Sequence, residues 1–362
     1  MAPVGVAIIG GGIWVKMHHL PSVLACQNLS LKAIYSRTLA SAQKAAQTIP
    51  PEASVSPDLY SSDSGPGKSY ADLLARSDIE AVIVCVNIRD GPTHAAEALS
   101  AGKHVLSEKP IAANIEAAKK LIDHWKSVVA GGKNVSLSIA ENFRFFESVN
   151  FATKESKKLG KLNGFQGRMF FPIGTDNSWL TDWRKQPTHQ GGFVLDAGIH
   201  FIAYLRSILG HENALESVSA YTAQVQPHLP PLDTVHCLMR TKSGVVGSIC
   251  ISSGTLYLES SETLFSFEDG AIIAEAGKVI VKSADLEAKK EGRNEVDTDE
   301  QHFDLAHYGV KEEVFAWAEG LVSGRPNPAQ SVEEALADIE VMEKMFKSGQ
   351  ENGAVQKLEY QL

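Results

Sequence analysis

The sequence predicts an α/β protein of two domains, the first of which contains a doubly wound parallel sheet. Three observations support this prediction. The chain has 362 residues, more than one hydrophobic core usually serves. Its first part alternates short, unbroken apolar runs with helical segments, as a parallel sheet buried on both faces requires. In the second part apolar residues recur at every second position, which is typical of a sheet with one face packed on helices.

Composition and charge exclude several classes of protein. Hydrophobic residues make up 44% and charged residues 21%, which are ordinary globular values, and the net charge of -9 gives no basis for binding nucleic acid or an anionic membrane. The scattered cysteines show no metal-ligand spacing, so we expect free thiols, no bound metal and a reducing compartment. No apolar run reaches the ~18 residues of a membrane span and no signal peptide is apparent. We therefore expect a cytoplasmic protein.

The first element is a buried strand over Val4–Ile9, followed directly by a glycine turn. Gly10 and Gly12 supply the first two glycines of a G-x-G-x-x-G turn, and Val15 stands where the third would be. Two glycines suffice for the tight turn and for close approach of backbone N–H groups to a pyrophosphate. The alternative is an ordinary tight turn, because such a triplet alone is a weak signal.

A second strand, 31–35, lies about twenty residues further on, where a dinucleotide fold binds the adenosine ribose. Ser36-Arg37-Thr38 follow it, with no carboxylate to repel a 2′-phosphate and with an arginine and two hydroxyls that could bind one. We interpret this as a preference for NADP(H), with NAD(H) possible. The alternative is that Arg37 is a solvent-facing turn residue.

Further alternation completes the first domain. We expect the Ser/Gly/Pro-rich stretch 54–69 to be a surface loop, and the strand 81–86 to end at Asn87. Other expected elements are helices at 40–47, 70–75, 94–101 and 119–125 and strands at 104–106 and 135–140.

The strand at 104–106 runs into Glu108-Lys109-Pro110. Its carboxyl end opens onto the edge where parallel sheets bind ligands, and an ammonium there can stabilise a developing alkoxide. Taken alone, the tripeptide would more often be a surface turn.

The apolar residues Leu195, Ile199, Ile202, Leu205 and Leu209 predict one amphipathic helix that Gly210 closes. Asp196 and His200 are four residues apart, so they project from the same face of this helix. A carboxylate one turn from an imidazole can fix its tautomer, as a general acid/base requires. The alternatives are a solvated pair and a buried histidine satisfied by its neighbour.

The second domain contains several strands with alternating polarity. We expect them at 165–171, 218–225, 234–241, 245–252, 264–268 and 278–282. One helix, which Phe303, His307 and Tyr308 begin, should run through Trp317, and a last helix should span 333–346. The loops 179–184 and 226–233 either line a pocket or simply pack. Arg144, just after the strand 135–140, either binds substrate or forms a structural salt bridge.

Taken together, these motifs resemble the Gfo/Idh/MocA family, named after glucose–fructose oxidoreductase and inositol dehydrogenase. The resemblance is carried by the glycine turn, by Gly102-Lys103-His104-Val105-Leu106 with Glu108-Lys109-Pro110, and by Gly191-Gly192, Asp196, Gly198 and His200, with Trp183-Arg184 upstream. It implies a Rossmann-type domain over residues 1–140 and a substrate-binding α+β domain over 141–362, with a large, open, mostly antiparallel sheet. The C-terminal helix can pack back on the first domain.

The resemblance also implies functional residues. Lys109, Asp196 and His200 would form the catalytic group, and substrate would contact these three together with Arg144 and Trp183. The cofactor would contact Gly10, Gly12, Ile13, Trp14, Ser36, Arg37, Thr38, Asn87, His94, Glu108 and Lys109. A homodimer or homotetramer through the open sheet is expected on the same ground.

We therefore interpret the chain as an NADP-dependent oxidoreductase that transfers a hydride between nicotinamide and a carbinol or carbonyl carbon of a sugar, polyol or similar vicinal-hydroxyl substrate. Two alternatives stay open. One is an NAD-dependent, redox-assisted glycoside hydrolase, and the other is a catalytically silent nucleotide-binding regulator.

Overall fold

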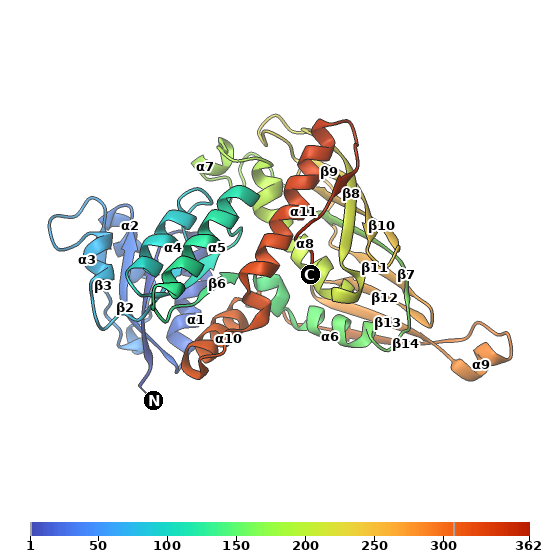
Figure 1. Cartoon of the computed structure of the whole chain (residues 1–362), viewed down its shortest axis with the longest axis horizontal. Helices are drawn as coiled ribbons and strands as arrows, with labels where there is room; N and C mark the ends of the chain where they lie inside the picture. Colours follow the sequence, from blue (N-terminus) through green and yellow to red (C-terminus); the bar gives the residue numbers. More distant parts are fainter. Residues whose placement is uncertain (1, 307) are drawn as a thin grey trace. The chain divides into compact units, whose positions relative to one another are not determined.

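The computed structural model describes residues 2–306 and 308–362, which fall into two compact units. The first unit takes the chain up to Asn142 and again from beyond residue 307 to Leu336. The second unit runs from Phe143 to Ala306 and from Ala337 to the C-terminus (Figure 1). Each unit is therefore built from two separate stretches of the chain.

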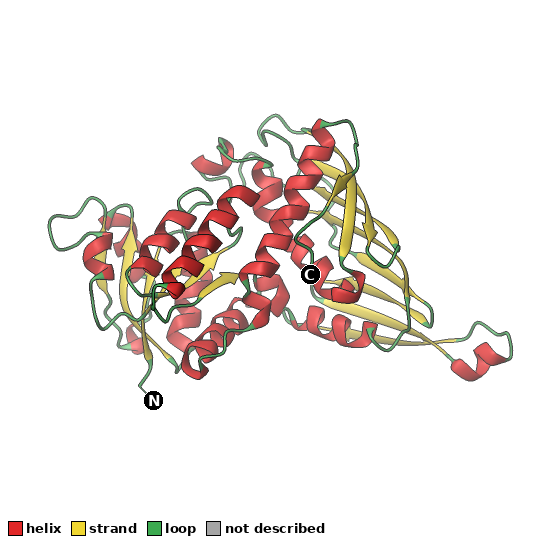
Figure 2. Cartoon of the chain, viewed as in Figure 1, coloured by secondary structure: helices red, strands yellow, loops and turns green. Residues whose placement is uncertain are grey.

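The first unit contains a six-stranded sheet with the order β3-β2-β1-β4-β5-β6, in which every pairing is parallel. Its central strands consist of apolar residues that are almost all buried, since helices lie on both faces (Figure 2). The strands are β1 (Val4–Ile9), β2 (Leu29–Ser36), β3 (Asp58–Ser61), β4 (Ala81–Val84), β5 (His104–Glu108) and β6 (Leu137–Ala140). The predicted doubly wound parallel sheet is confirmed.

Local capping explains where several helices of this unit begin. The side chains of Thr38, Ser69 and Asn114 each accept a backbone N–H at the first turn of α2, α3 and α5. The helices are the π-helix η1 (Val15–His19), α1 (Leu20–Ala25), α2 (Leu39–Ala46), η2 (Pro51–Ala53), α3 (Tyr70–Leu74), α4 (Gly91–Ser100), α5 (Ile115–Ala130), α10 (Val310–Ser323) and η5 (Pro328–Gln330).

Helix α10 completes the core of the first unit. Its side chains Val314 and Trp317 are buried in the same apolar cluster as Val6 and Ile8 of β1. The helix begins at Val310, so the prediction that it begins near Phe303 is wrong. The prediction made for His307 lies outside the described residues.

Strand β3 lies inside the stretch 54–69 that the sequence predicts to be a loop. It pairs in parallel with β2, with Ser61 beside Ser36, and Tyr60 and Ser61 are buried. The prediction is wrong for these four residues because pairing with β2, rather than a local apolar pattern, makes them a strand.

The second unit contains a nine-stranded sheet with the order β14-β13-β12-β11-β7-β10-β9-β8-β15. The pairing of β7 with β10 is parallel and the others are antiparallel, which confirms the expected mostly antiparallel sheet. The strands are β7 (Leu162–Phe170), β8 (Leu215–Ala223), β9 (Thr234–Thr241), β10 (Val246–Ser252), β11 (Thr263–Phe267), β12 (Gly270–Glu275), β13 (Lys278–Ala284), β14 (Val296–His302) and β15 (Gln356–Lys357).

One face of this sheet is covered and the other is open. Along β9 buried and exposed residues alternate, so Val235, Cys237 and Met239 face the core while Leu238 is 60% exposed. The helices of this unit are η3 (Asn142–Phe145), α6 (Glu147–Ser156), α7 (Asp182–Lys185), α8 (Gly192–Leu209), η4 (His211–Asn213), α9 (Leu286–Lys290) and α11 (Val332–Gln350), of which η3 and α11 also reach into the first unit. Helices α6, α8 and α11 lie on the covered side, whereas α9 lies beyond the end of the β13–β14 hairpin (Figure 1).

Helix α8 is the predicted helix that carries Asp196 and His200, and Gly210 ends it as predicted. It is buried over most of its circumference rather than along one stripe. Gly198 allows it to lie close to β10, since a Cβ there would come within 3.1 Å of Ile251 Cγ2. The helix is long and apolar enough to cross a membrane, but 83% of it is buried, as in the core helix of a globular unit.

Candidate active site

The glycine turn after β1 contains one sterically crowded glycine, Gly10, and one open glycine, Gly12. Gly10 has a φ of +136°, and a Cβ there would lie 2.1 Å from the carbonyl oxygen of Cys85, so only glycine fits. At Gly12 no atom of the described residues lies within 4 Å of an added Cβ, so this side of the turn is open to a ligand. Val15 stands at the third glycine position, is buried in the core and begins the π-helix η1. Ile13 and Trp14 lie between Gly12 and Val15 and are half-buried.

The end of β2 places Ser36-Arg37-Thr38 at the same edge of the sheet. Ser36 is buried, Arg37 is exposed, and Thr38 caps α2. The strand end itself carries no carboxylate, but Asp63, from the loop after β3, accepts the backbone N–H of Leu39 at 2.8 Å. The sequence spacing gave no signal of this contact.

The loop after β4 is organised by Asn87. Its side-chain amide donates to Asp90 Oδ2 at 2.6 Å, and its Oδ1 accepts the backbone N–H of Arg89 at 3.0 Å. His94, on α4, lies beside Tyr70 and Tyr35, with ring centroids 5.0 and 6.0 Å away. Burial raises the pKa of Tyr70, so its hydroxyl stays neutral and donates to the carbonyl of His94 at 2.8 Å.

Glu108 ends β5, and both of its carboxylate oxygens are engaged. Oε1 accepts a hydrogen bond from His19 Nε2 at 2.7 Å, and Oε2 accepts the backbone N–H of Lys109 at 3.1 Å. Because a carboxylate only accepts, His19 Nε2 carries the proton. His19 is fully buried, and within the described part of the chain its Nδ1 has no hydrogen-bond partner. The hydrogen bond between His19 and Glu108 was not predicted, because 89 residues separate the two in the sequence.

The remaining part of the Gly102-Lys103-His104 signature is structural. The Lys103 ammonium donates to the carbonyl oxygens of Arg76 and Ile79, both at 2.7 Å, and the residue is buried. Burial lowers its pKa. Lys103 therefore ties the start of β5 to the chain before β4, whereas Lys109 follows the opposite, carboxyl end of β5, where a ligand would lie.

In the second unit Asp196 is held by an arginine. Arg184 Nε donates to Asp196 Oδ2 at 2.6 Å, and the carboxylate is nearly buried. The guanidinium lies over the ring of Trp183, 4.2 Å from its centroid. Trp183 and Asp196, both predicted site residues, thus belong to one cluster that Arg184 joins.

His200 and His189 lie near this cluster. The His200 ring stacks on Phe143, with centroids 4.6 Å apart and an interplanar angle of 16°. His189 Nε2 donates to the carbonyl of Gly192 at 3.3 Å, and burial lowers its pKa although Asp196 opposes the shift. His189 was not predicted; its position just before the Gly191-Gly192 turn was the available signal.

Arg144 is engaged in a buried ion pair. Its Nη2 donates to Asp338 Oδ2 at 2.6 Å, and Arg206 Nη1 donates to the other oxygen at 2.6 Å. All three side chains are less than 10% exposed. The structure thus shows the structural salt bridge, which is one of the two roles left open for Arg144.

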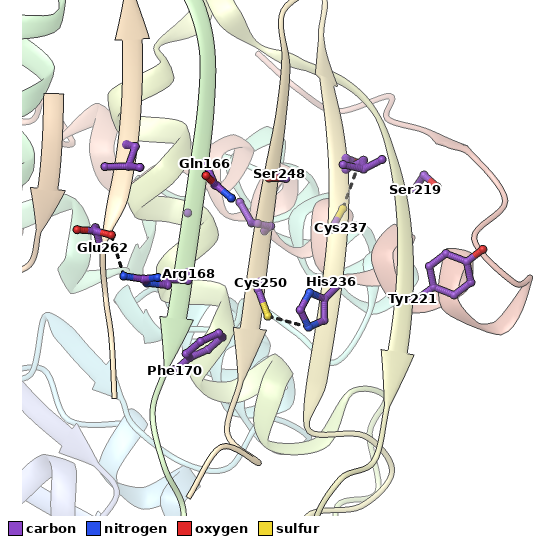
Figure 3. Close-up of a pocket in the computed structure, with 14 residues that line it drawn as sticks. Gln166, Arg168, Phe170, Ser219, Tyr221, His236, Cys237, Ser248, Cys250 and Glu262 are labelled. Carbon is purple, nitrogen blue, oxygen red and sulfur yellow. Dashed lines mark hydrogen bonds and ion pairs between the residues drawn. The ribbon is translucent and has the colours of Figure 1, made fainter. Parts of the chain in front are cut away.

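A shallow pocket lies on the open face of the nine-stranded sheet, remote in the sequence from the motifs above (Figure 3). It measures about 460 Å³. Cys250 and His236 are hydrogen-bonded in it at 3.2 Å, and Arg168 pairs with Glu262 at 3.0 Å. Burial raises the pKa of Cys250 to about 11, so its sulfur is a neutral thiol near pH 7. None of the predicted site residues lines this pocket.

Comparison with known proteins identifies the family. Residues 4–129 match the oxidoreductase family with an NAD-binding Rossmann fold, and residues 155–357 match its C-terminal alpha/beta domain. The chain belongs to the Gfo/Idh/MocA oxidoreductase family. This confirms the resemblance and the expectation of a nucleotide-binding oxidoreductase.

Relatives of this Gfo/Idh/MocA protein include a Fusarium mangiferae protein named dehydrogenase FPY6, which is 35% identical over 99% of this chain and 100% of its own length. An uncharacterised protein of Saccharomyces cerevisiae is 29% identical, covering 99% of both chains. Among solved structures, levoglucosan dehydrogenase in complex with NADH and L-sorbose has a TM-score of 0.81 at 20% identity, covering 99% of this chain and 100% of that one. That likeness establishes the fold.

Proposed function

We propose that this protein is an NADP-dependent oxidoreductase acting on a CH–OH or carbonyl group of a sugar, polyol or similar vicinal-hydroxyl substrate. The observation that carries the proposal is the carboxyl edge of the parallel sheet. There the open Gly12 and the Glu108–Lys109 turn follow strand ends of one sheet. Levoglucosan dehydrogenase bound to L-sorbose and an aldose–aldose oxidoreductase from Caulobacter crescentus bound to glycerol share the fold, which supports the substrate class.

The residues of the first unit fit a dinucleotide. The open space beside Gly12 lets backbone N–H groups approach a pyrophosphate, and no Cβ fills it. Exposed Arg37 and Thr38 at the end of β2 support preference for a 2′-phosphate. The relatives bound to NADH or NAD indicate that the unphosphorylated cofactor remains an alternative. When bound, nicotinamide supplies the hydride acceptor or donor.

The protein's own residues supply binding and proton transfer in this proposal. Lys109 donates a hydrogen bond to the reacting oxygen and polarises it, and its backbone is fixed by the Glu108 carboxylate. His200 takes the proton from that oxygen during oxidation and returns it during reduction. Asp196, whose carboxylate is held by Arg184, lies one helical turn before His200 and orients its imidazole.

We also propose that the open face of the nine-stranded sheet mediates a homodimer or homotetramer. Tyr221, Leu238 and Val246 on this sheet are each more than half exposed. Neighbouring apolar side chains of this kind, around a partly polar pocket, are characteristic of an interface between subunits (Figure 3).

The decisive experiment measures binding and turnover separately. Purified protein is titrated with NADP(H) and NAD(H), and absorbance of reduced nicotinamide is then followed with a panel of aldoses, polyols and dihydrodiols. We expect tighter binding of NADPH and turnover on at least one member of the panel. A Lys109→Met variant should bind nucleotide but lose most turnover, whereas Lys133→Met, a substitution in a surface loop, should leave it unchanged. Tight binding without turnover on the whole panel would contradict the proposed activity.

A further inference from the structure

The loop after β3 brings a carboxylate to the first turn of α2. Strands β2 and β3 are paired so that Ser61 lies beside Ser36, and Asp63 follows two residues later. Asp63 Oδ1 accepts the backbone N–H of Leu39 at 2.8 Å and the hydroxyl of Ser61 at 2.6 Å. The charge therefore lies directly after Ser36-Arg37-Thr38, although 24 residues separate it from Leu39.

Several hydrogen bonds fix this loop in place. Ser61 is buried, and its hydroxyl also lies 2.5 Å from that of Ser64. The Tyr35 hydroxyl bonds to that of Ser62 at 2.6 Å, and the backbone N–H of Ser61 donates to the carbonyl of Lys68 at 2.9 Å. The hydrogen bonds from Ser61 and Leu39 lower the pKa of Asp63, so its carboxylate is charged at neutral pH.

This position has a defined role in dinucleotide folds. The end of the second strand lies at the 2′ oxygen of the adenosine ribose, where a carboxylate accepts a hydrogen bond from a 2′-hydroxyl and repels a 2′-phosphate. Arg37 has the opposite preference, because a guanidinium attracts phosphate. The first turn of α2 therefore combines a cation from its own strand end with an anion from a neighbouring loop.

We propose that Asp63 is a specificity-determining residue of the nucleotide site, which disfavours the 2′-phosphate and keeps NAD(H) usable beside NADP(H). The inference rests on the proposed function in that it requires the nucleotide to bind at this edge. It adds that discrimination depends on the opposing charges of Arg37 and Asp63, not on the end of β2 alone.

The substitution Asp63→Asn tests this directly. Asparagine keeps an oxygen that can accept the Leu39 N–H and the Ser61 hydroxyl, but it removes the charge. Affinities of the full-length protein for 2′,5′-ADP and 5′-AMP are measured by titration calorimetry, because these probes differ only in the 2′-phosphate. We expect the preference for 2′,5′-ADP over 5′-AMP to rise by roughly 3- to 30-fold, and the change to shrink at high salt, since exposed charges are screened.

Asp72→Asn is the matched control. Asp72 is also an exposed carboxylate with a lowered pKa that caps a helix, but it belongs to α3 and contacts Ser69. The substitution Asp72→Asn changes the net charge by the same amount as Asp63→Asn. It should leave the ratio of the affinities for 2′,5′-ADP and 5′-AMP unaltered. Asp63→Ser is a second neutral variant should Asp63→Asn unfold at a lower temperature than the wild type.

The outcomes separate this inference from the proposed function. A wild-type protein that prefers 5′-AMP would contradict NADP preference, yet a rise in the ratio for Asp63→Asn would still support the role of Asp63. An identical ratio in wild type, Asp63→Asn and Asp63→Ser would overturn the inference and leave the NADP proposal standing. A rise of equal size in Asp72→Asn would also overturn it, because the effect would then be one of net charge.

Discussion

The six-stranded sheet is buried on both faces, whereas the nine-stranded sheet leaves one face open. Every residue of β4 and β6 is buried, but β9 alternates between buried and exposed positions. Side chains inside the first sheet are therefore unavailable to a ligand, and the polar groups of that unit lie at the strand ends. In the second unit the polar groups of the candidate site project from a buried helix, α8, and from the short helix α7 that contacts it.

The two units hold their functional groups in position by different means. In the first unit these groups are positioned mainly by backbone geometry, through the glycine turn and the N–H of Lys109. In the second unit charged side chains hold one another, as Asp196 and Arg184 do, and as Arg144, Arg206 and Asp338 do. Removing one side chain should therefore reduce activity or stability more in the second unit than in the first. Four substitutions test this comparison, from the largest expected effect to the smallest.

The largest effect is expected for His200→Ala. Removing the proposed acid/base should lower kcat by about 10²- to 10⁴-fold while nucleotide affinity stays nearly unchanged. Steady-state kinetics and nucleotide titration measure the two quantities. His302→Ala, on exposed β14, is the control and should have wild-type activity. Equal turnover in His200→Ala and wild type would remove His200 from the mechanism.

The next effect concerns stability. Asp338→Ala leaves Arg144 and Arg206 buried without their shared carboxylate, so the free energy of unfolding should fall by about 3–5 kcal/mol. Urea denaturation measures this quantity. Asp297→Ala, on the exposed strand β14, should change it by less than about 0.5 kcal/mol. Similar small changes in both variants would show that the buried triad is not what stabilises the second unit.

A smaller effect is expected in the first unit. His19→Leu removes the hydrogen bond to Glu108 Oε1 and should destabilise the protein by about 1–3 kcal/mol. If His19 acts through Glu108, its effect on kcat should largely disappear in a Glu108→Gln background, as a double-mutant cycle would measure. His124→Leu, which loses a neutral hydrogen bond to Ser100, is the control. Fully additive effects on kcat would contradict coupling between His19 and Glu108.

The smallest effect on folding is expected on the open face. Leu238→Glu should change the free energy of unfolding by less than about 0.5 kcal/mol, because Leu238 is 60% exposed. If this face joins subunits, the same variant should have a smaller mass by light scattering than the wild type. Val225→Glu, an equally exposed position in the loop after β8, should keep the wild-type mass. An unchanged mass for Leu238→Glu would place any subunit contact elsewhere.

Much of the fold could be predicted from the sequence because its signals are local. The buried runs of β1 and β4 and the apolar spacing of α8 determine those elements almost to the residue. Strands β3, β12, β14 and β15 were not predicted; β3 and β15 are short, and β14 is exposed throughout. Their conformation depends on the strands beside them, which no local pattern encodes.

The candidate site was predicted less completely, for a related reason. The residue types Lys109, Asp196 and His200 are visible as motifs, but their partners are distant in sequence. His19 reaches Glu108 across 89 residues, and Arg144 reaches Asp338 across 194. Spacing rules describe neighbours on one helix or strand and cannot supply such pairs. The ion pair of Arg144 with Asp338 and the approach of Asp63 to the end of β2 are both contacts of this kind.

The return of the chain to the first unit has a consequence for synthesis. Trp317 and Val314 belong to the core built around β1, yet the ribosome makes them long after Ala140 ends β6. At a translation rate of roughly 5–20 residues per second, helix α10 is synthesised about 10 to 40 s after the last strand of the parallel sheet. During that interval apolar side chains packed around β1 lack part of their cover. A truncation before Val310 would leave this core incomplete permanently, because it would remove a piece of the nucleotide-binding unit.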